Sequence, residues 1–111
     1  MNDISDKFAP LRKGLLELVV LKIISAHKVY AADILGKLNK TDFATGEGTL
    51  YPLLSRLRRD KLVDYEWVES EAGPPRKYYR LTTEGVAQLR ALESYWQKMH
   101  NTIEGLGGSH E

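Results

Sequence analysis

The spacing of the hydrophobic residues changes twice along the chain, and this order limits the folds that it can adopt. One segment carries Leu50, Leu53, Leu54 and Leu57. Their i, i+3, i+4, i+7 spacing is typical of a helix with one buried face. After Lys61 the hydrophobic residues of LVDYEWV and KYYRLT alternate, which predicts two strands. Helical spacing then returns. The chain is therefore predicted to place a β-hairpin between helices.

Two more helices are predicted before the leucine segment. The first, in LRKGLLELVVLKIISAHK, is expected to be buried on much of its circumference. Its stripe consists of Leu15, Leu18, Val19 and Ile23, widened by Leu16, Val20, Leu21 and Ile24. The second covers about residues 31–40, with Ile34, Leu35 and Leu38 on its apolar face. The two glycines of FATGEGT then predict a loop.

The leucine segment carries a concentration of positive charge. Residues 48–61 hold four Lys or Arg side chains and one Asp, a net charge of +3, whereas the whole chain has a net charge of +1. Pro52 lacks an amide hydrogen and is tolerated best in a first turn, so we expect a helix over 49–60 with Thr49 as its N-cap. The face opposite the leucines presents Gly48, Pro52, Ser55 and Arg59, flanked by Tyr51 and Arg56. A solvated helix face would also explain these arginines.

The hairpin and the last helix have separate sequence signatures. SEAGPPR, with its glycine and two prolines, predicts a polar turn at the tip of the hairpin. Thr82 or Thr83 supplies capping chemistry for a helix that runs to about residue 104, and the tail GLGGSHE is expected to fray. The apolar residues of this helix are Leu89, Leu92, Trp96, Met99, Ile103 and Leu106. Their alternating intervals form the a/d pattern of a helix that pairs with another helix.

Length and composition exclude several classes of protein. A chain of 111 residues with 42% hydrophobic and 28% charged residues is predicted to form one soluble domain. Cysteine is absent and the first residues lack the pattern of a signal peptide, so a cytoplasmic location is expected. No apolar stretch is long enough to span a membrane. His27, His100 and His110 are isolated, and no arrangement of nucleophile, base or metal ligands stands out. Neither an enzyme nor a cofactor is predicted.

The order helix, helix, helix, hairpin, long helix is that of a winged helix-turn-helix protein. In that fold the third helix enters the major groove of DNA and the hairpin reaches a neighbouring stretch of backbone. We therefore predict an α+β, mainly α, chain with a DNA-binding domain at 1–82 and a C-terminal dimerisation helix with a flexible tail at 83–111. Its expected partners are double-stranded DNA and a second copy of the chain. The predicted DNA-binding residues are Lys40, Gly48, Thr49, Tyr51, Ser55, Arg56, Arg59, Arg76 and Lys77.

Several motifs resemble those of PadR-type transcriptional regulators. They are GEGTLYPLLSRLRRDKLV and GPPRKYYRLTTEGVAQL, together with LRKGLLELVVLKII and VYAADIL nearer the N-terminus. The resemblance covers roughly residues 11–106. Two positions depart from the family pattern, since Ala31 replaces a common glycine and Lys61 stands where the helix usually ends in glycine. A lysine there must adopt a left-handed conformation, or the helix must end differently.

The short C-terminal region is similar to that of the small, multidrug-responsive PadR-like repressors. The resemblance implies that the last helix builds the dimer together with the first, and that Trp96 lines a pocket at the interface. Simple interface packing is the alternative for this tryptophan. The residues assigned to the pocket are Trp96, Leu15, Val19, Leu92, Glu93, Met99 and His100. Planar aromatic molecules are expected as ligands, because two indole rings related by a twofold axis would form a flat slot. Glu93 and Glu104 lie on the same helix and would favour cationic compounds.

These observations predict a homodimeric repressor that binds a pseudo-palindromic operator and is released by a small planar aromatic or multidrug-type effector. Two alternatives stay open. One is a dimeric winged-helix module that contacts protein instead of DNA, and the other is a protein that only sequesters small molecules. Binding to duplex DNA that weakens with salt would favour the repressor, because Lys and Arg release condensed counterions when they contact phosphates.

Overall fold

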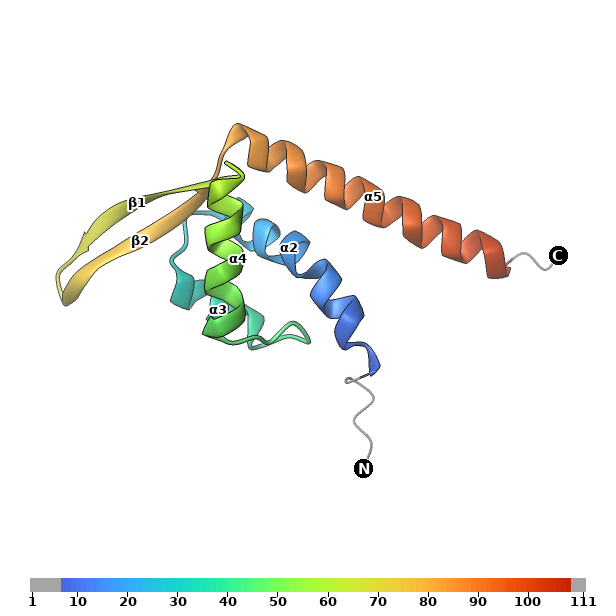
Figure 1. Ribbon diagram of the computed structural model, residues 1–111, viewed down its shortest axis with the longest axis horizontal. Helices are drawn as coiled ribbons and strands as arrows, with labels where there is room; N and C mark the ends of the chain where they lie inside the picture. The colour runs from blue at the N-terminus through green and yellow to red at the C-terminus, as the bar shows by residue number, and fades with distance from the viewer. Residues whose placement is uncertain (1–6, 109–111) are drawn as a thin grey trace, which may run out of the picture.

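The structure is a computed structural model that describes residues 7–108. These residues form four helices and one antiparallel hairpin (Figure 1). The elements are α2 (Ala9–Ala26), α3 (Ala31–Leu38), α4 (Glu47–Arg59), β1 (Val63–Ser70), β2 (Gly73–Leu81) and α5 (Thr83–Gly108). The predicted class is confirmed: the chain is mainly helical, with a two-stranded wing and a long C-terminal helix.

The core lies where α2, α3 and α4 meet the base of the hairpin. Its buried side chains include Leu16, Val20, Leu21 and Ile24 of α2, Ile34 and Leu38 of α3, and Leu50, Leu54 and Leu57 of α4. The other part of the predicted α2 stripe, with Leu15, Leu18 and Val19, is only half-buried. One side of α2 therefore packs into the core of this chain, and the adjoining apolar side stays partly uncovered.

The N-terminus of α4 lies two residues earlier than predicted. Gly46 is the N-cap, and its carbonyl accepts hydrogen bonds from the amides of Thr49 and Leu50 at 3.2 and 3.0 Å. Thr49 is therefore inside the first turn, and the prediction that it caps the helix is wrong; glycine is itself favourable at an N-cap. Pro52 consequently lies beyond the first turn and removes the amide that would bind the Gly48 carbonyl. Because Gly48 is exposed, water can bind that carbonyl instead.

Lys61 ends α4 in the left-handed conformation that usually favours glycine, with a φ angle of 64°. Its amide donates to the Arg58 carbonyl and the amide of Leu62 donates to the Leu57 carbonyl, both at 2.9 Å. These two hydrogen bonds make a Schellman motif. The left-handed conformation costs a residue with a side chain about 1–2 kcal/mol. The hydroxyl of Thr82 helps to hold it by donating to the Lys61 carbonyl at 2.7 Å.

The hairpin, called the wing from here on, is longer than predicted. Its strands pair from Val63 with Leu81 at the base to Ser70 with Gly73 near the tip. The two prolines expected in the turn belong to β2, where an irregularity in the register accommodates them. A two-stranded sheet tolerates proline because each strand keeps an unpaired edge. Val29 forms a β-bridge with Tyr79, which ties the base of the wing to the connection between α2 and α3.

The start of α5 lies very close to the turn between α4 and β1. Thr82 caps the helix as predicted, since its Oγ1 accepts the amide of Gly85 at 2.9 Å. Gly85 is buried, and a Cβ atom at this position would lie 1.9 Å from the carbonyl oxygen of Leu62, so only glycine permits the approach. Residues 105–108 are helical, which corrects the expectation that they fray, while His110 lies outside the described residues.

The wing and α5 extend in opposite directions from the core (Figure 1). The described chain measures 62 × 41 × 21 Å and has a radius of gyration of 16.7 Å. A compact domain of this length would have a radius of gyration of about 13 Å. Figure 1 also shows the second half of α5 projecting past α2. A single copy of the chain therefore leaves much of α5 uncovered.

Candidate nucleic-acid interface

The exposed side of α4 carries the small, hydroxyl and cationic side chains expected from its sequence. Gly48, Tyr51, Ser55 and Arg59 are exposed, opposite the buried leucines. Small side chains at the first two turns of this face allow another surface to approach the backbone of the helix. This is the shape that a helix needs to enter the major groove, which admits one helix.

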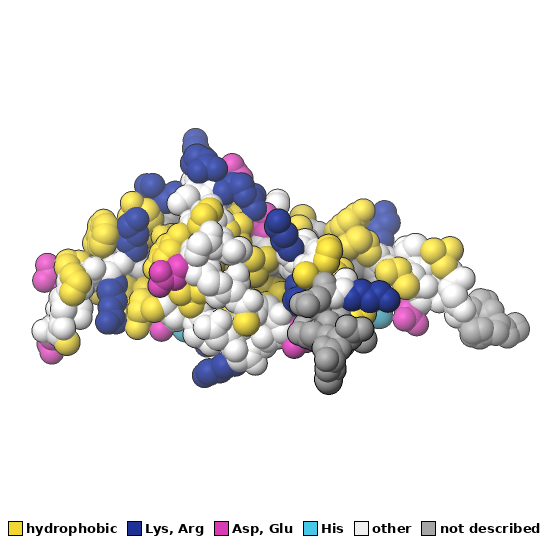
Figure 2. Space-filling view, turned by 60° about the horizontal axis from the view of Figure 1, so that its bottom comes forward, with side chains coloured by type: hydrophobic (Ala, Val, Ile, Leu, Met, Phe, Trp, Pro, Cys, Tyr) yellow, Lys and Arg dark blue, Asp and Glu magenta, His cyan; other side chains and the backbone are white. Residues whose placement is uncertain are grey.

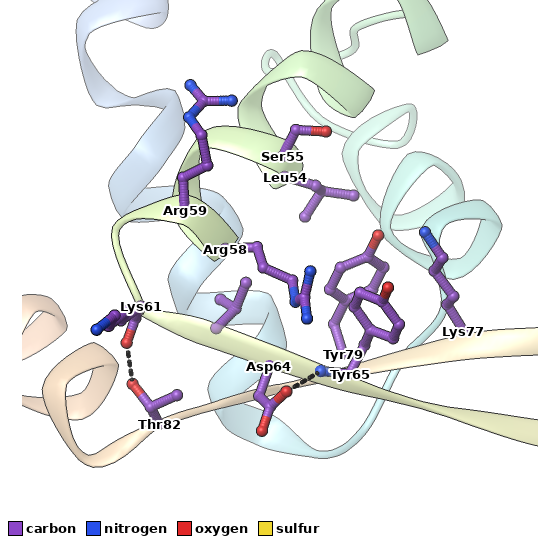
Figure 3. Close-up of a pocket in the computed structure, with 11 residues that line it drawn as sticks. Leu54, Ser55, Arg58, Arg59, Lys61, Asp64, Tyr65, Lys77, Tyr79 and Thr82 are labelled. Carbon is purple, nitrogen blue, oxygen red and sulfur yellow. Dashed lines mark hydrogen bonds between the residues drawn. The ribbon is translucent and has the colours of Figure 1, made fainter.

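A cavity of about 600 Å³ lies between α4 and the wing (Figure 3). It is lined by Leu54, Ser55, Arg58, Arg59, Lys61, Val63, Asp64, Tyr65, Lys77, Tyr79 and Thr82. This space is called the α4–wing cavity below. Ser55 and Arg59 belong both to its lining and to the exposed face of α4, so the cavity continues that face toward the wing.

Arg58 and Lys77 lie against the same aromatic ring in this cavity. Cζ of Arg58 is 4.4 Å from the ring centroid of Tyr65, and Nζ of Lys77 is 4.5 Å from it. Figure 3 shows the rings of Tyr65 and Tyr79 between these two cations, which come from α4 and β2. Burial raises the pKa of the Tyr79 hydroxyl, so this tyrosine stays neutral and adds no negative charge to the cavity.

A second cavity, of about 440 Å³, adjoins the first on the side of α3. It shares Ser55, Lys77 and Tyr79 with the α4–wing cavity and adds Tyr30, Tyr51 and Arg76. The guanidinium of Arg76 lies 4.5 Å from the ring centroid of Tyr30, which is the N-cap residue of α3. The positive end of the α3 dipole therefore adds to the charge of Arg76 at this cavity.

Arg56, also among the predicted DNA contacts, is paired with carboxylates. Its guanidinium lies 3.1 Å from Glu17 of α2 and 3.8 Å from Asp60. Glu17 also accepts a hydrogen bond from Gln88 of α5 at 3.4 Å. Arg56 therefore connects α4 to α2, and much of its charge is compensated within the chain.

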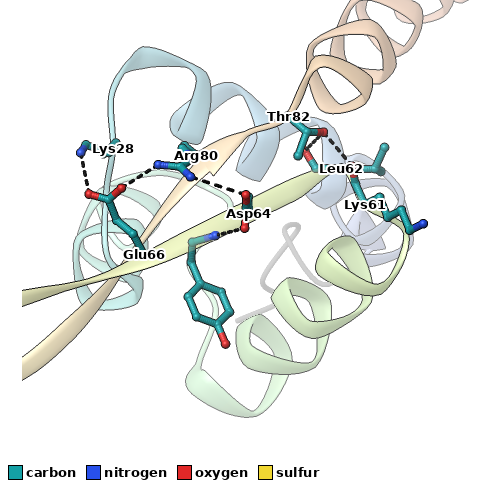
Figure 4. A network of polar contacts seen from close by, with 8 residues as sticks. Lys28, Lys61, Leu62, Asp64, Glu66, Arg80 and Thr82 are labelled. Carbon is teal, nitrogen blue, oxygen red and sulfur yellow. Dashed lines mark hydrogen bonds and ion pairs between the residues drawn. The ribbon is translucent and has the colours of Figure 1, made fainter.

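A charged network fastens the other face of the wing (Figure 4). Arg80 pairs with Asp64 at 3.5 Å and with Glu66 at 2.6 Å, and Lys28 pairs with Glu66 at 3.0 Å. The hydrogen bond from Lys28, with a further contribution from Arg80, lowers the pKa of the Glu66 carboxyl. Both carboxylates of the network are thus engaged by cations, and they offset little of the positive charge of the two cavities.

The two cavities hold five cations that pair with no carboxylate within residues 7–108. They are Arg58, Arg59, Lys61, Arg76 and Lys77. Figure 2 shows several dark-blue Lys and Arg side chains over the half of the molecule that carries α4 and the wing, and others nearer α5. Lys40, another predicted DNA contact, is exposed in the turn after α3 and lines neither cavity. A surface with this concentration of uncompensated cations attracts polyanions.

The chain that carries this surface is similar to a family of known proteins. Residues 20–91 match the transcriptional regulator PadR-like family. The chain belongs to this family. A PadR-like transcription factor of Bacteroides fragilis is 43% identical, with a TM-score of 0.78 over 92% of this chain and 99% of that one.

Two other solved structures have similar folds. A PadR-like transcriptional regulator of Bacillus cereus is 37% identical, with a TM-score of 0.81 over 92% of this chain and all of that one (100%). A PadR family regulator of Eggerthella lenta is 31% identical, with a TM-score of 0.85 over 96% of this chain and 94% of that one. The protein is therefore a PadR-like transcriptional regulator, from a family of regulators and not of enzymes.

The residues that sequence analysis assigns to a ligand pocket lie on two helices of this PadR-like regulator. Leu15 and Val19 of α2, and Leu92 and Glu93 of α5, are half-buried, whereas Trp96, Met99 and His100 are exposed. α2 packs against α5, and Lys22 pairs with Glu93 across this contact. The ring centroids of Trp96 and His100 are 6.4 Å apart. No helix in the part of the chain that the structure describes is long and apolar enough to cross a membrane.

Several side chains in the lining of the α4–wing cavity are outside the list of predicted DNA contacts, and three of them matter most for its charge and shape. They are Arg58, Lys61 and Tyr65. Arg58 lies beside the leucine face of α4 and not opposite it. Helical periodicity therefore assigns it neither to the core nor to the face expected to contact DNA. The short connection between α4 and β1 is the sequence feature that could have indicated these side chains. A strand that begins within a few residues of the end of a helix must run back past the last turn of that helix.

Proposed function

We propose that this PadR-like regulator is a cytoplasmic homodimer that represses transcription by binding a pseudo-palindromic operator. The observation that carries the proposal is the strip of five uncompensated cations beside the exposed face of α4. In this proposal α4 enters the major groove and the wing contacts the adjoining backbone. Residues 1–82 act as the DNA-binding part, and residues 83–111 act as the dimerisation part.

An uncovered apolar stripe on α5 supports the homodimer. Trp96, Met99, Ile103 and Leu106 are exposed by 41, 37, 67 and 83%. Figure 2 shows hydrophobic side chains reaching the surface repeatedly along this helix. Large apolar side chains at a/d spacing are stable in water only when another helix covers them. Two DNA-binding parts (residues 1–82 of each chain, called heads below) joined in this way would contact half-sites about one helical turn of DNA apart, about 34 Å.

The first test compares two arginines of α4 that differ in their partners. Arg59→Ala should lower affinity for a short duplex and reduce the slope of log K against log salt by about 0.9, the effect of one lost phosphate contact. Arg56→Ala should change the slope less, since Glu17 and Asp60 already hold that guanidinium. Fluorescence anisotropy across a series of salt concentrations measures both slopes.

The same pair of variants contains its own control. Each loses one arginine from α4, so a general effect of net charge would change both slopes equally. If both variants reduce the salt slope equally, a positive charge at any position on α4 contributes equally to DNA binding. The exposed face of α4 would then not be the specific DNA contact. A wild-type protein that fails to bind duplex DNA would exclude the regulator mechanism as a whole.

We also propose that a planar aromatic or cationic molecule binds between the two α5 helices and releases the operator. Trp96 supports this, since a twofold axis along the apolar stripe would bring both indole rings together. Leu15, Val19, Leu92, Glu93, Met99 and His100 are the further proposed contacts. Glu93 contributes less to a preference for cations than its charge suggests, because Lys22 neutralises it. The ligand must bind one spacing of the heads better than another in order to change DNA affinity.

Trp96→Ala should abolish the quenching of tryptophan fluorescence by a planar cationic dye such as proflavine. Stacking of the dye on the indole places the quencher in direct contact with the fluorophore. Trp67→Phe is the matched control, because Trp67 is 62% exposed on the wing, on the opposite side of the core from α5. Quenching that survives Trp96→Ala and disappears in Trp67→Phe would place the dye on the wing.

A further inference from the structure

The α4–wing cavity contains a pair of cations that lie over the same tyrosine ring, and Nζ of Lys77 is also 5.5 Å from the ring centroid of Trp67. Arg58 and Lys77 come from different elements, yet each lies within 4.5 Å of the Tyr65 ring centroid. Their charged atoms can therefore be no more than 8.9 Å apart. Figure 3 shows the two side chains on either side of the tyrosine rings, whereas Arg59 and Lys61 extend away from those rings.

The Tyr65 ring is itself held in place by the wing. It packs edge-on against Tyr79, with ring centroids 5.7 Å apart, and Tyr79 is only 6% exposed. It also packs edge-on against Trp67, with ring centroids 6.2 Å apart. Tyr65 and Tyr79 are also directly paired across the two strands. A ring anchored in this way gives both cations a fixed aromatic surface before any partner binds.

Neither cation is compensated by a carboxylate. Asp64 is the acidic residue in the lining of the cavity, and it is occupied by Arg80 at 3.5 Å and by the Tyr65 amide, which donates at 2.8 Å. Arg58 and Lys77 pair with no carboxylate within the described chain. Two ordered cations without counter-charge in one cavity form a site for phosphate oxygens.

We propose that the α4–wing cavity binds the DNA backbone, and that Tyr65 is the positioning residue that directs Arg58 and Lys77 to neighbouring phosphates of one strand. This inference rests on the proposed DNA-binding function and adds a site to it. Ser55 lies on the exposed face of α4 and also lines the cavity, so a strand beside α4 would pass over both. The site reads no sequence, because phosphate contacts set position and not specificity.

The proposal predicts different behaviour for the cations and for the tyrosine. Changing Arg58 and Lys77 together to Gln should reduce the salt slope for a short duplex of arbitrary sequence by about two units, because two phosphate contacts are lost. Tyr65→Leu keeps both charges, so it should leave the slope nearly unchanged while lowering affinity about tenfold at every salt concentration. Tyr65→Phe retains the ring and should bind like the wild type.

The pattern of the variants separates positioning from loss of fold. Thermal unfolding of each variant reports the fold, and rescue by phenylalanine but not leucine assigns the effect to the ring. If the Arg58 and Lys77 double variant keeps the wild-type slope while Arg59→Ala reduces it, the pair formed by Arg58 and Lys77 does not contact the DNA backbone and the proposed function still stands. If neither variant alters the slope, α4 does not contact DNA and both proposals fail.

A small phosphorylated molecule would present the same chemistry as the DNA backbone. Inorganic phosphate is the probe for this source, added in competition with the duplex at constant ionic strength against chloride. We expect phosphate and chloride to weaken DNA binding equally. Saturable displacement by phosphate alone, abolished in the Arg58 and Lys77 double variant, would identify a site for a free phosphate ligand and overturn the proposal.

Discussion

Replacing Gly85 with alanine is expected to lower the free energy of unfolding by about 3 kcal/mol or more, among the largest effects available to a single methyl group in this chain. The added Cβ would lie 1.9 Å from the carbonyl oxygen of Leu62 and 2.9 Å from its carbon. Both are backbone atoms, so no side-chain rotation relieves the clash. The same carbonyl accepts the amide of Thr82 at 3.1 Å, and a shift of this backbone would weaken that bond.

Gly36→Ala provides a matched control for this prediction. Gly36 lies in the interior of α3, is exposed, and an added Cβ would have no neighbour within 4 Å. The substitution there should stabilise the protein by up to about 1 kcal/mol, since alanine has the higher helix propensity. Chemical denaturation measures both changes. A loss of stability in both variants, or in neither, would contradict the close packing at Gly85.

Changing Met99 and Ile103 together to Glu is expected to convert the proposed dimer into a folded monomer. Two carboxylates per chain would enter an apolar interface, where an unpaired buried charge costs several kcal/mol. Both residues are exposed in a single chain, so the core of the monomer should be unaffected. Leu92 belongs to the same stripe but packs against the chain's own core, and its substitution would disturb the fold as well.

Gln97→Glu with Asn101→Glu is the control for the dimer experiment. These two residues are exposed on the opposite side of α5 and add the same charge. Size exclusion with light scattering should report a dimer for the control and a monomer for the Met99 and Ile103 variant, and circular dichroism should report a folded chain for both. A dimeric Met99 and Ile103 variant would place the interface elsewhere and remove the support for a pocket at Trp96.

The order of the elements is predictable from the sequence because each element carries its own period. The leucines of α4 and the alternation of the wing depend on local spacing, and the structure confirms both. The ends of elements were less predictable. The sequence places the start of α4 too late because a cap by Gly46 leaves no side-chain signal. The prolines of β2 predict a turn, because only the free edge of a two-stranded sheet accommodates proline within a strand.

The exposed face of α4 could also be predicted, but the partners of its charges could not. Arg56 and Glu17 are separated by 39 residues, and nothing in the sequence indicates that α2 brings them together. The contact of Arg58 and Lys77 with Tyr65 likewise depends on the angle between α4 and the wing. Periodicity identifies which side chains face outward, whereas compensation of their charges is a property of the assembled fold.

The packing at Gly85 has a mechanical consequence for the distance between the two DNA-binding domains of the proposed dimer. α5 contains 26 residues and is thus about 39 Å long, and its first turn packs closely against Leu62. A rotation of about 5° at Gly85 would move the far end by about 3 Å, comparable to the rise of one base pair. Because the glycine leaves no free space beside Leu62, such a rotation is resisted sterically. The distance between the two DNA-binding domains of the proposed dimer would therefore change when one α5 helix slides along the other, and not when α5 bends at its first turn.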